Sequence, residues 1–118
     1  MTGQRYGRGS FEFSNGEMPV ATVAASGSAS GDSPIAGGFT LVTAADGPKA
    51  VTLPDATAGA VCFIKNNVAQ SLILFPSKGD KINGGTATTG SLTIAASKSC
   101  ILVAYDDTDW YSFPLLPS

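Results

Sequence analysis

The 118-residue sequence contains no histidine, and this absence removes the commonest source of acid–base chemistry. Histidine is the side chain whose ordinary pKa makes it a general base near neutral pH. The chain also has no Gly-x-Ser-x-Gly nucleophile motif and no phosphate loop ending in Gly-Lys-Ser or Gly-Lys-Thr. We therefore expect no enzymatic activity, no catalytic residues and no cofactor.

Charged residues are also scarce: they make up 14% of the chain, against an average of about 25% in soluble proteins. Long charged side chains cost desolvation and rotamer entropy at contacts, so their scarcity is typical of proteins that assemble. The net charge of -2 argues against nucleic acid as a partner, because binding to phosphates needs clustered lysine and arginine. We expect a homo-oligomer that does not bind nucleic acid.

The sequence lacks long apolar runs. No segment approaches the roughly 18 apolar residues of a membrane-spanning helix. The first ten residues, MTGQRYGRGS, lack the apolar stretch of a signal peptide. We expect a soluble protein that is made in a reducing cytoplasm and has no membrane partner.

Two groups of residues could be considered as metal ligands, and neither predicts a metal site. Cys62 and Cys100 lie inside apolar runs and are expected to be buried free thiols, with a disulfide between neighbouring strands as the alternative. Two thiols without histidine do not make a zinc site. Asp106, Asp107 and Asp109 could gather around calcium, but a calcium loop needs further ligands and a glycine turn, so the segment predicts a polar turn.

Short apolar runs separated by turn residues predict an all-β fold. We interpret residues 59–76 as a central β-hairpin, in which two apolar runs flank Lys65, Asn66 and Asn67. The predicted architecture is an antiparallel sandwich or barrel, jelly-roll-like, with an extended N-terminal arm. Outside the hairpin, strands are expected at residues 11–13, 19–25, 39–43, 50–53, 81–83, 91–95, 99–105 and 110–113.

Residues 26–38 are rich in glycine and small polar residues, which favours a linker, although an ordinary surface loop has the same composition. We place the boundary here, between an N-terminal arm and linker over residues 1–36 and a β-domain over residues 37–118. The arm holds both arginines, Arg5 and Arg8, beside Tyr6 and several glycines. Arginine forks pair with carboxylates at interfaces, so these residues are candidates for binding a partner, with a solvated tail as the alternative.

Aromatic residues supply the remaining candidates. Phe11 and Phe13 would lie on one face of a short strand in the arm and could fill apolar grooves of a partner. Trp110 and Tyr111 follow the acidic turn and could stack on a sugar together with the Thr-rich loop of residues 86–89. The alternative for Trp110 is a place in the core or in a subunit contact.

The segments LPDATAGAVCFIKNNVAQSLILFPSKGDKINGG and SLTIAASKSCILVAYDDTDWYSF carry a family resemblance. They resemble a β-domain of tailed-phage virion proteins, in which a G-x-x-x-x-I-K-N strand leads to P-x-x-G-D-x-I-N and then to a Trp-containing strand. The resemblance covers about half of the chain. The matching positions are Gly59, Ile64, Lys65, Asn66, Pro76, Gly79, Asp80, Ile82, Asn83, Trp110 and Ser112.

The resemblance implies a structural role without enzymatic activity: a capsid decoration (cement) protein, or a head- or tail-fibre component, usually trimeric. A short arm without a fibre shaft favours decoration. The expected partner is the major capsid protein, bound through Arg5, Tyr6, Arg8, Phe11 and Phe13, which places the protein on the capsid surface of the virion. The alternative is a receptor- or glycan-binding module of a head or tail fibre, in which Trp110 and Tyr111 contact the ligand.

Overall fold

The structure is a computed structural model that describes residues 17–114, and these residues form nine β-strands and no helix. The predicted all-β class is therefore confirmed, and in this part of the chain no helix is long and apolar enough to cross a membrane. The strands are β1 (Val20–Ala24), β2 (Gly38–Ala44), β3 (Lys49–Thr52), β4 (Val61–Asn66), β5 (Leu72–Phe75), β6 (Lys81–Ile82), β7 (Leu92–Ile94), β8 (Ser99–Ala104) and β9 (Asp109–Pro114).

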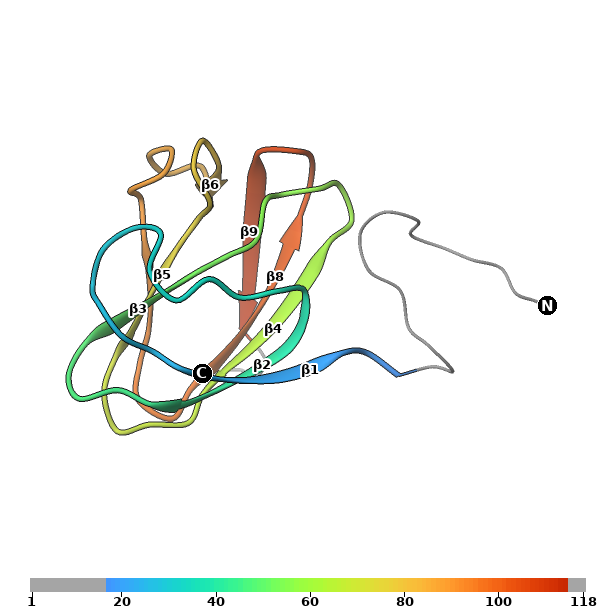
Figure 1. Ribbon diagram of the computed structural model, residues 1–118. Coiled ribbons are helices and arrows are strands. Elements are labelled where there is room, and N and C mark those ends of the chain that lie inside the picture. The colour runs from blue at the N-terminus through green and yellow to red at the C-terminus, as the bar shows by residue number, and fades with distance from the viewer. Residues whose placement is uncertain (1–16, 115–118) are drawn as a thin grey trace.

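The strands form two sheets that share one apolar core (Figure 1). The larger sheet has the order β1-β2-β4-β8-β9-β6, and the smaller has the order β3-β5-β7. Alternate residues of each strand point to one face, so every second residue of β2, β4 and β8 is buried. The largest fully buried apolar side chains are Trp110, Leu53, Ile64, Leu72, Leu74, Leu102, Val42 and Val51.

Both sheets are mixed, so the prediction of antiparallel sheets is wrong. β1, β2 and β4 pair in parallel in the larger sheet, and β3 and β5 pair in parallel in the smaller. The parallel pairs β2–β4 and β3–β5 arise because the chain alternates between the two sheets from β2 to β5 and re-enters each sheet in the same direction. Only β7, β8 and β9 add antiparallel pairs.

The predicted central hairpin over residues 59–76 is also wrong, although both of its strands exist. β4 pairs with β2 and β8, whereas β5 lies in the other sheet between β3 and β7. The loop between them crosses from one sheet to the other instead of reversing the chain within one sheet. Each strand buries one apolar face, and opposing these faces across the core removes more apolar surface from water than pairing them edge to edge.

Asn66 holds the corner where β4 leaves the larger sheet. Its side chain is fully buried, and Nδ2 lies 2.8 Å from the carbonyl oxygen of Gln70 and 3.1 Å from those of Ile94 and Ala95. One amide group therefore ties the crossing loop to the end of β7 in the smaller sheet. These hydrogen bonds satisfy the buried Nδ2 group, whereas the buried Oδ1 of Asn66 has no hydrogen-bond partner among the described residues.

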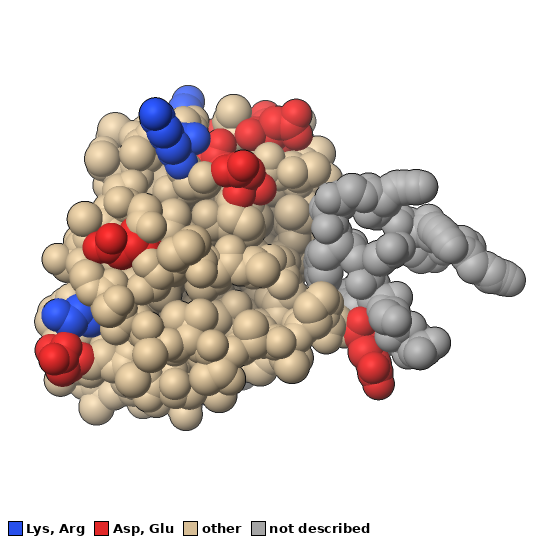
Figure 2. All heavy atoms as spheres, in the orientation of Figure 1, with Lys and Arg blue, Asp and Glu red and all other residues tan. Residues whose placement is uncertain are grey.

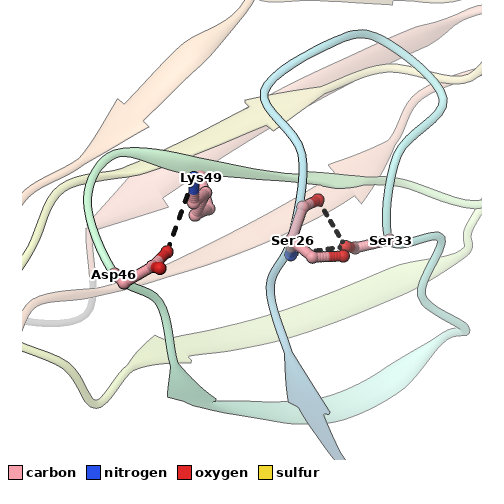
Figure 3. Close-up of polar contacts among 4 residues, drawn as sticks. All are labelled: Ser26, Ser33, Asp46 and Lys49. Carbon is pink, nitrogen blue, oxygen red and sulfur yellow. Dashed lines mark hydrogen bonds and ion pairs between the residues drawn. The ribbon is translucent and has the colours of Figure 1, made fainter.

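Residues 26–38 form a loop whose contacts connect it to the body of the domain. Ser33 Oγ donates to the carbonyl oxygen of Ser26 and accepts from its N–H, both at 3.0 Å, which closes the loop (Figure 3). Ile35 is buried in the core, and Pro34 forms a parallel bridge with Thr52 of β3. The figure also shows the Lys49–Asp46 ion pair at 3.5 Å, which is exposed at the β2–β3 turn and adds little stability.

The two cysteines are buried free thiols, as predicted. They lie on the neighbouring strands β4 and β8, in diagonal positions, because Cys62 pairs with Leu102 and Cys100 pairs with Ile64. Burial raises the pKa of Cys62 to about 12 and also raises the pKa of Cys100. Both groups therefore stay protonated at neutral pH and serve as small apolar side chains.

Asp80 is a buried carboxylate that joins two loops at the end of the smaller sheet. Its Oδ2 accepts a hydrogen bond from the N–H of Ala56 at 2.8 Å, and its side chain is 6% exposed. Burial raises its pKa, and the charges of Asp55, Asp109 and Asp106 raise it further, against the lowering effect of the Ala56 hydrogen bond. The folded protein thus binds a proton at Asp80 more readily than the unfolded chain does.

This raised pKa predicts how the stability responds to pH. As the pH falls from 7 through the folded-state pKa, the folded state takes up the proton first, so the free energy of unfolding rises. Asp80→Asn should remove this component and be at least as stable as the wild type at pH 7, because the amide oxygen can still accept from Ala56. Asp80→Ala should cost about 1–3 kcal/mol, because it leaves the Ala56 N–H without an acceptor.

Urea unfolding of the wild type and both variants at pH 7 and pH 5 measures these differences. Subtracting the Asp80→Asn curve from the wild-type curve removes the contribution of the other carboxylates. If Asp80→Asn were as unstable as Asp80→Ala at pH 7, the carboxylate charge would be favourable and this interpretation of its pKa would fail.

Candidate functional site: an apolar face of the larger sheet

The larger sheet has an apolar face on the side away from the core. The residues that alternate with the buried positions of β2, β4, β8 and β9 point to this side, and no other strand of the described residues packs on it (Figure 1). We call this surface the outer face. Its apolar residues are Phe39, Leu41, Val61, Phe63, Ile101, Val103, Tyr111 and Phe113.

Strand register aligns four of these residues in a row across the sheet. Phe39 of β2 pairs with Phe63 of β4, Phe63 pairs with Ile101 of β8, and Ile101 pairs with Phe113 of β9. Val20 of β1 pairs with Phe39 and extends the row to the edge of the sheet. Directly opposed apolar side chains contact each other across strands, so the row forms one continuous apolar ridge.

A second row lies beside the first, toward the start of β4, and ends in an aromatic pair. Val61 pairs with Val103, which pairs with Tyr111 of β9. The ring of Tyr111 meets the ring of Tyr105 edge to face, with centroids 6.4 Å apart and planes at 78°. Tyr105 is 74% exposed, Tyr111 is 44% exposed and Phe113 is 50% exposed, so large apolar groups face water at this end.

Neither row contains a charged residue. Lys65 lies next to them on β4, and its Nζ donates to the carbonyl oxygen of Ser97 at 2.7 Å, which directs its charge toward the β7–β8 turn. Figure 2 shows how unevenly charge is distributed on the side in view: charged groups gather near the end where β6 lies, and most of the remaining surface is uncharged. The outer face therefore favours an apolar partner over an ionic one.

The size of the outer face limits what it can bind alone. Neighbouring strands lie about 4.8 Å apart and residues i and i+2 roughly 6.6 Å apart. The two rows therefore cover about 20 Å by 10 Å, on the order of 200 Å² in projection. Each partner in a specific stable complex buries about 800 Å². The outer face can thus form the centre of an interface but needs additional contacts from elsewhere.

Trp110 does not belong to this surface, because its side chain is fully buried between the sheets. Its Nε1 has no hydrogen-bond partner among the described residues. Of the alternatives considered for Trp110, the core position is the one that the structure shows. Tyr111, the next residue, points to the outer face, so the two aromatic residues that the sequence grouped together lie on opposite sides of β9.

The Thr-rich loop of residues 86–89 makes hydrogen bonds to two other loops. In this loop, Thr88 Oγ1 accepts a hydrogen bond from the N–H of Gly79 at 2.8 Å, and the carbonyl oxygen of Thr88 accepts one from Ser30 Oγ at 3.1 Å. The loop is therefore held against the β5–β6 connection and the loop of residues 26–38. The predicted sugar site, which combined this loop with Trp110 and Tyr111, is not assembled in the structure.

The acidic turn after β8 is ordered by its own hydrogen bonds. Asp106 Oδ1 accepts from the N–H groups of Thr108 and Asp109 at 3.0 and 2.8 Å, and these bonds, led by the one from Thr108, lower the pKa of Asp106. Within residues 17–114, no group of three or more His, Cys, Asp or Glu side chains is placed to hold a metal ion. The turn is thus a polar β-turn.

Several residues that carry the family resemblance meet at the start of β9. Asn83 Nδ2 donates to Ser112 Oγ at 2.8 Å, Asn83 Oδ1 accepts from the N–H of Ser112 at 3.0 Å, and the N–H of Asn83 donates to the Trp110 carbonyl at 2.8 Å. These contacts fix the end of β6 against β9. Asn66, Asp80 and Asn83 therefore hold strand ends and their loops in place.

The predicted arm residues Arg5, Tyr6, Arg8, Phe11 and Phe13 lie outside the described residues. In contrast, sequence reasoning missed Phe39, Phe63 and Ile101 as surface residues. A signal was present: β4 and β8 are apolar at both alternating positions, a pattern typical of strands that are covered on both faces. Comparison with known protein families, curated proteins and solved structures found no match for this chain.

Proposed function

We propose that this protein is a structural virion protein without enzymatic activity, a capsid decoration (cement) protein that binds the assembled head of a tailed phage. The observation that carries the proposal is the outer face, an uncharged ridge of aromatic and aliphatic side chains with no strand of the described residues packed on it. Apolar and aromatic side chains grouped in this way can form the core of a protein–protein interface. The resemblance of residues 53–113 to phage virion β-domains supplies the identity of the partner, the major capsid protein.

In the proposed mechanism, the outer face seats on capsid subunits, and the N-terminal segment provides the contacts that a face of this size lacks. Arg5 and Arg8 would pair with acidic groups, with Tyr6, Phe11 and Phe13 adding apolar contacts. Val20–Ala24 is β1 of the larger sheet, so only the residues of the arm before β1 are available for this role. A homotrimer on the capsid surface and a jelly-roll-like sandwich remain part of the proposal.

Decoration would stabilise the head through mass action. A protein that binds assembled subunits and not free ones shifts the equilibrium toward the assembled shell. The proposal needs no catalytic group, which agrees with the positions of Asn66, Asp80 and Asn83 at strand ends. The uncharged outer face also suits a contact that must hold at varying salt, since apolar burial is not screened.

Binding to empty heads that lack the protein tests this proposal. We expect the full chain to sediment with the heads, and both Phe113→Gln and deletion of residues 1–14 to weaken binding at least about tenfold, which equals about 1.4 kcal/mol. Lys49→Gln is the matched control, because its ion pair lies at the β2–β3 turn, and its binding should not change. Undiminished binding by both test variants would contradict the proposal.

The exposed tyrosines favour a second candidate function, a glycan-binding module of a head or tail fibre. Tyr105 and Tyr111 present two neighbouring rings to solvent, and such rings can stack on a sugar. This function would use Tyr105 and Tyr111 without Trp110. Saccharide binding by the isolated protein that is lost in Tyr105→Ala would favour it, whereas binding to heads that survives this substitution favours decoration.

A further inference from the structure

We propose that, in the free protein, Phe11 and Phe13 dock on the outer face of the same chain and cover its apolar rows. Docking would remove apolar side chains of the outer face from water, which favours the covered state. The proposal names the occupant as the segment that precedes β1. It concerns the protein before any partner binds, so it does not rest on the proposed function.

The point where the chain enters the sheet places this segment at one end of the row. The N–H of Phe39 donates to the Pro19 carbonyl oxygen at 2.9 Å, which anchors the chain beside the start of β2. A Cβ at Gly38 would come within 2.5 Å of that carbonyl oxygen, so glycine permits the close approach. The next residue, Val20, is the first member of the apolar row. Residues before Pro19 therefore leave from the edge of the outer face.

The length of the segment is sufficient to reach the near part of the outer face. The structure places residues 17–19, so only the residues before Glu17 are free to fold back. From Glu17, Phe13 can lie up to roughly 13 Å away and Phe11 up to roughly 20 Å away when the chain is extended, at about 3.3 Å per residue. The row from Val20 to Phe63 spans two strand spacings, about 10 Å. Phe11 and Phe13 can thus reach the apolar side chains of β2 and β4 without moving residues 17–19.

The residue pattern of the segment matches the chemistry of the face. In an extended chain, Phe11 and Phe13 point to one side and Glu12 to the other. Their spacing, about 6.6 Å, equals the spacing between the two apolar rows. Both rings can therefore contact the outer face while the Glu12 carboxylate stays in water, and no charge is buried.

Area and concentration favour this occupant over a second copy of the chain. The outer face covers on the order of 200 Å², too little for a stable dimer, in which each partner buries about 800 Å². A short segment needs no such area, because its connection to β1 gives it an effective concentration in the millimolar range. A second copy of the chain is present only at its dilute solution concentration, so it would bind the outer face less often than the tethered segment does.

Nuclear Overhauser effects in the full-length protein test the docking. With labelled phenylalanine rings and isoleucine and valine methyl groups, we expect contacts from Phe11 and Phe13 to the methyl groups of Val61 on β4. These contacts should disappear in the Phe11→Ser, Phe13→Ser double variant and persist in Glu12→Gln. Contacts of Ile101 with Phe63 and Phe113, its neighbours in the row, should remain in every variant and report that the sheet is intact.

Mixing labelled and unlabelled chains separates the possible occupants. Contacts that appear within one chain support the proposal, whereas contacts between chains would overturn it in favour of a second copy. A spectrum of Val61 that is the same in the wild type and the double variant would also overturn it. Deletion of residues 1–14 offers a second comparison if the double variant is poorly soluble. Success or failure of head binding does not alter this outcome.

Discussion

Asn66→Asp is expected to lower the free energy of unfolding at pH 7 by about 3–5 kcal/mol, the cost of an uncompensated buried charge. Asn66 is fully buried, and its Nδ2 lies within 3.1 Å of three backbone carbonyl oxygens. A carboxylate has no proton to donate, so the substitution would place negative charge against three acceptors. Small domains have only about 5–15 kcal/mol of stability, so this change should leave the fold marginal.

Comparison with a second variant, Asn66→Ala, and comparison of two pH values test this prediction. Asn66→Ala should cost about 1–3 kcal/mol, because it removes the donor without adding a charge. The introduced aspartate should have a raised pKa, so its variant should gain stability as the pH falls, with the folded state taking up the proton first. Urea unfolding at pH 7 and pH 5 measures both effects. Equal stability of Asn66→Asp and Asn66→Ala at pH 7 would contradict the prediction, because it would show that the carboxylate is not held in the buried position next to the three carbonyl oxygens.

Trp110→Ala is expected to cost about 3–5 kcal/mol, as is usual when a fully buried aromatic side chain is truncated. Trp110 lies between the sheets on β9, which pairs with both β8 and β6, so its loss leaves a cavity where three strands meet. Thermal and urea unfolding followed by far-ultraviolet circular dichroism measure the change, since the chain has no second tryptophan for fluorescence.

Trp110→Phe is the matched control for the core position. Its cost should be smaller than that of alanine, because less volume is lost and the Nε1–H that it removes has no partner among the described residues. If Trp110→Ala kept wild-type stability while abolishing ligand binding, Trp110 would act at a binding surface, contrary to its buried position.

The positions of the strands could largely be predicted from the sequence. Apolar–polar alternation located β2, and short apolar or aromatic runs between turn residues located β8 and β9, each within one or two residues. Turn residues such as Gly47 and Pro48 marked where strands end. These signals are local, and they depend on only a few neighbouring residues.

The pairing of the strands could not be predicted, because alternation shows which face of a strand is buried but not which strand lies beside it. The five residues between β4 and β5 have the length of a hairpin loop, yet they cross between sheets. The determinant is the side chain of Asn66, whose hydrogen bonds reach residues 28 and 29 positions away. The spacing of residues along the sequence does not indicate such long-range contacts.

The outer face illustrates the same limit for the candidate site. The apolar runs of β4 and β8 indicated that something covers both of their faces. That Phe39, Phe63, Ile101 and Phe113 form a single row follows from parallel pairing of β2 with β4 and antiparallel pairing of β8 with β4 and β9. A one-residue shift in any pair would place one of these side chains in the core instead.

The number of copies per particle tests the proposed function most directly, measured in purified virions of the tailed phage that the proposal predicts to encode this chain. Quantitative gel densitometry or mass spectrometry can compare the protein with the major capsid protein in the same particles. A decoration protein should approach the abundance of the major capsid protein. A few copies per particle would contradict decoration and favour a fibre component, and absence from purified virions would contradict a structural role in the particle altogether.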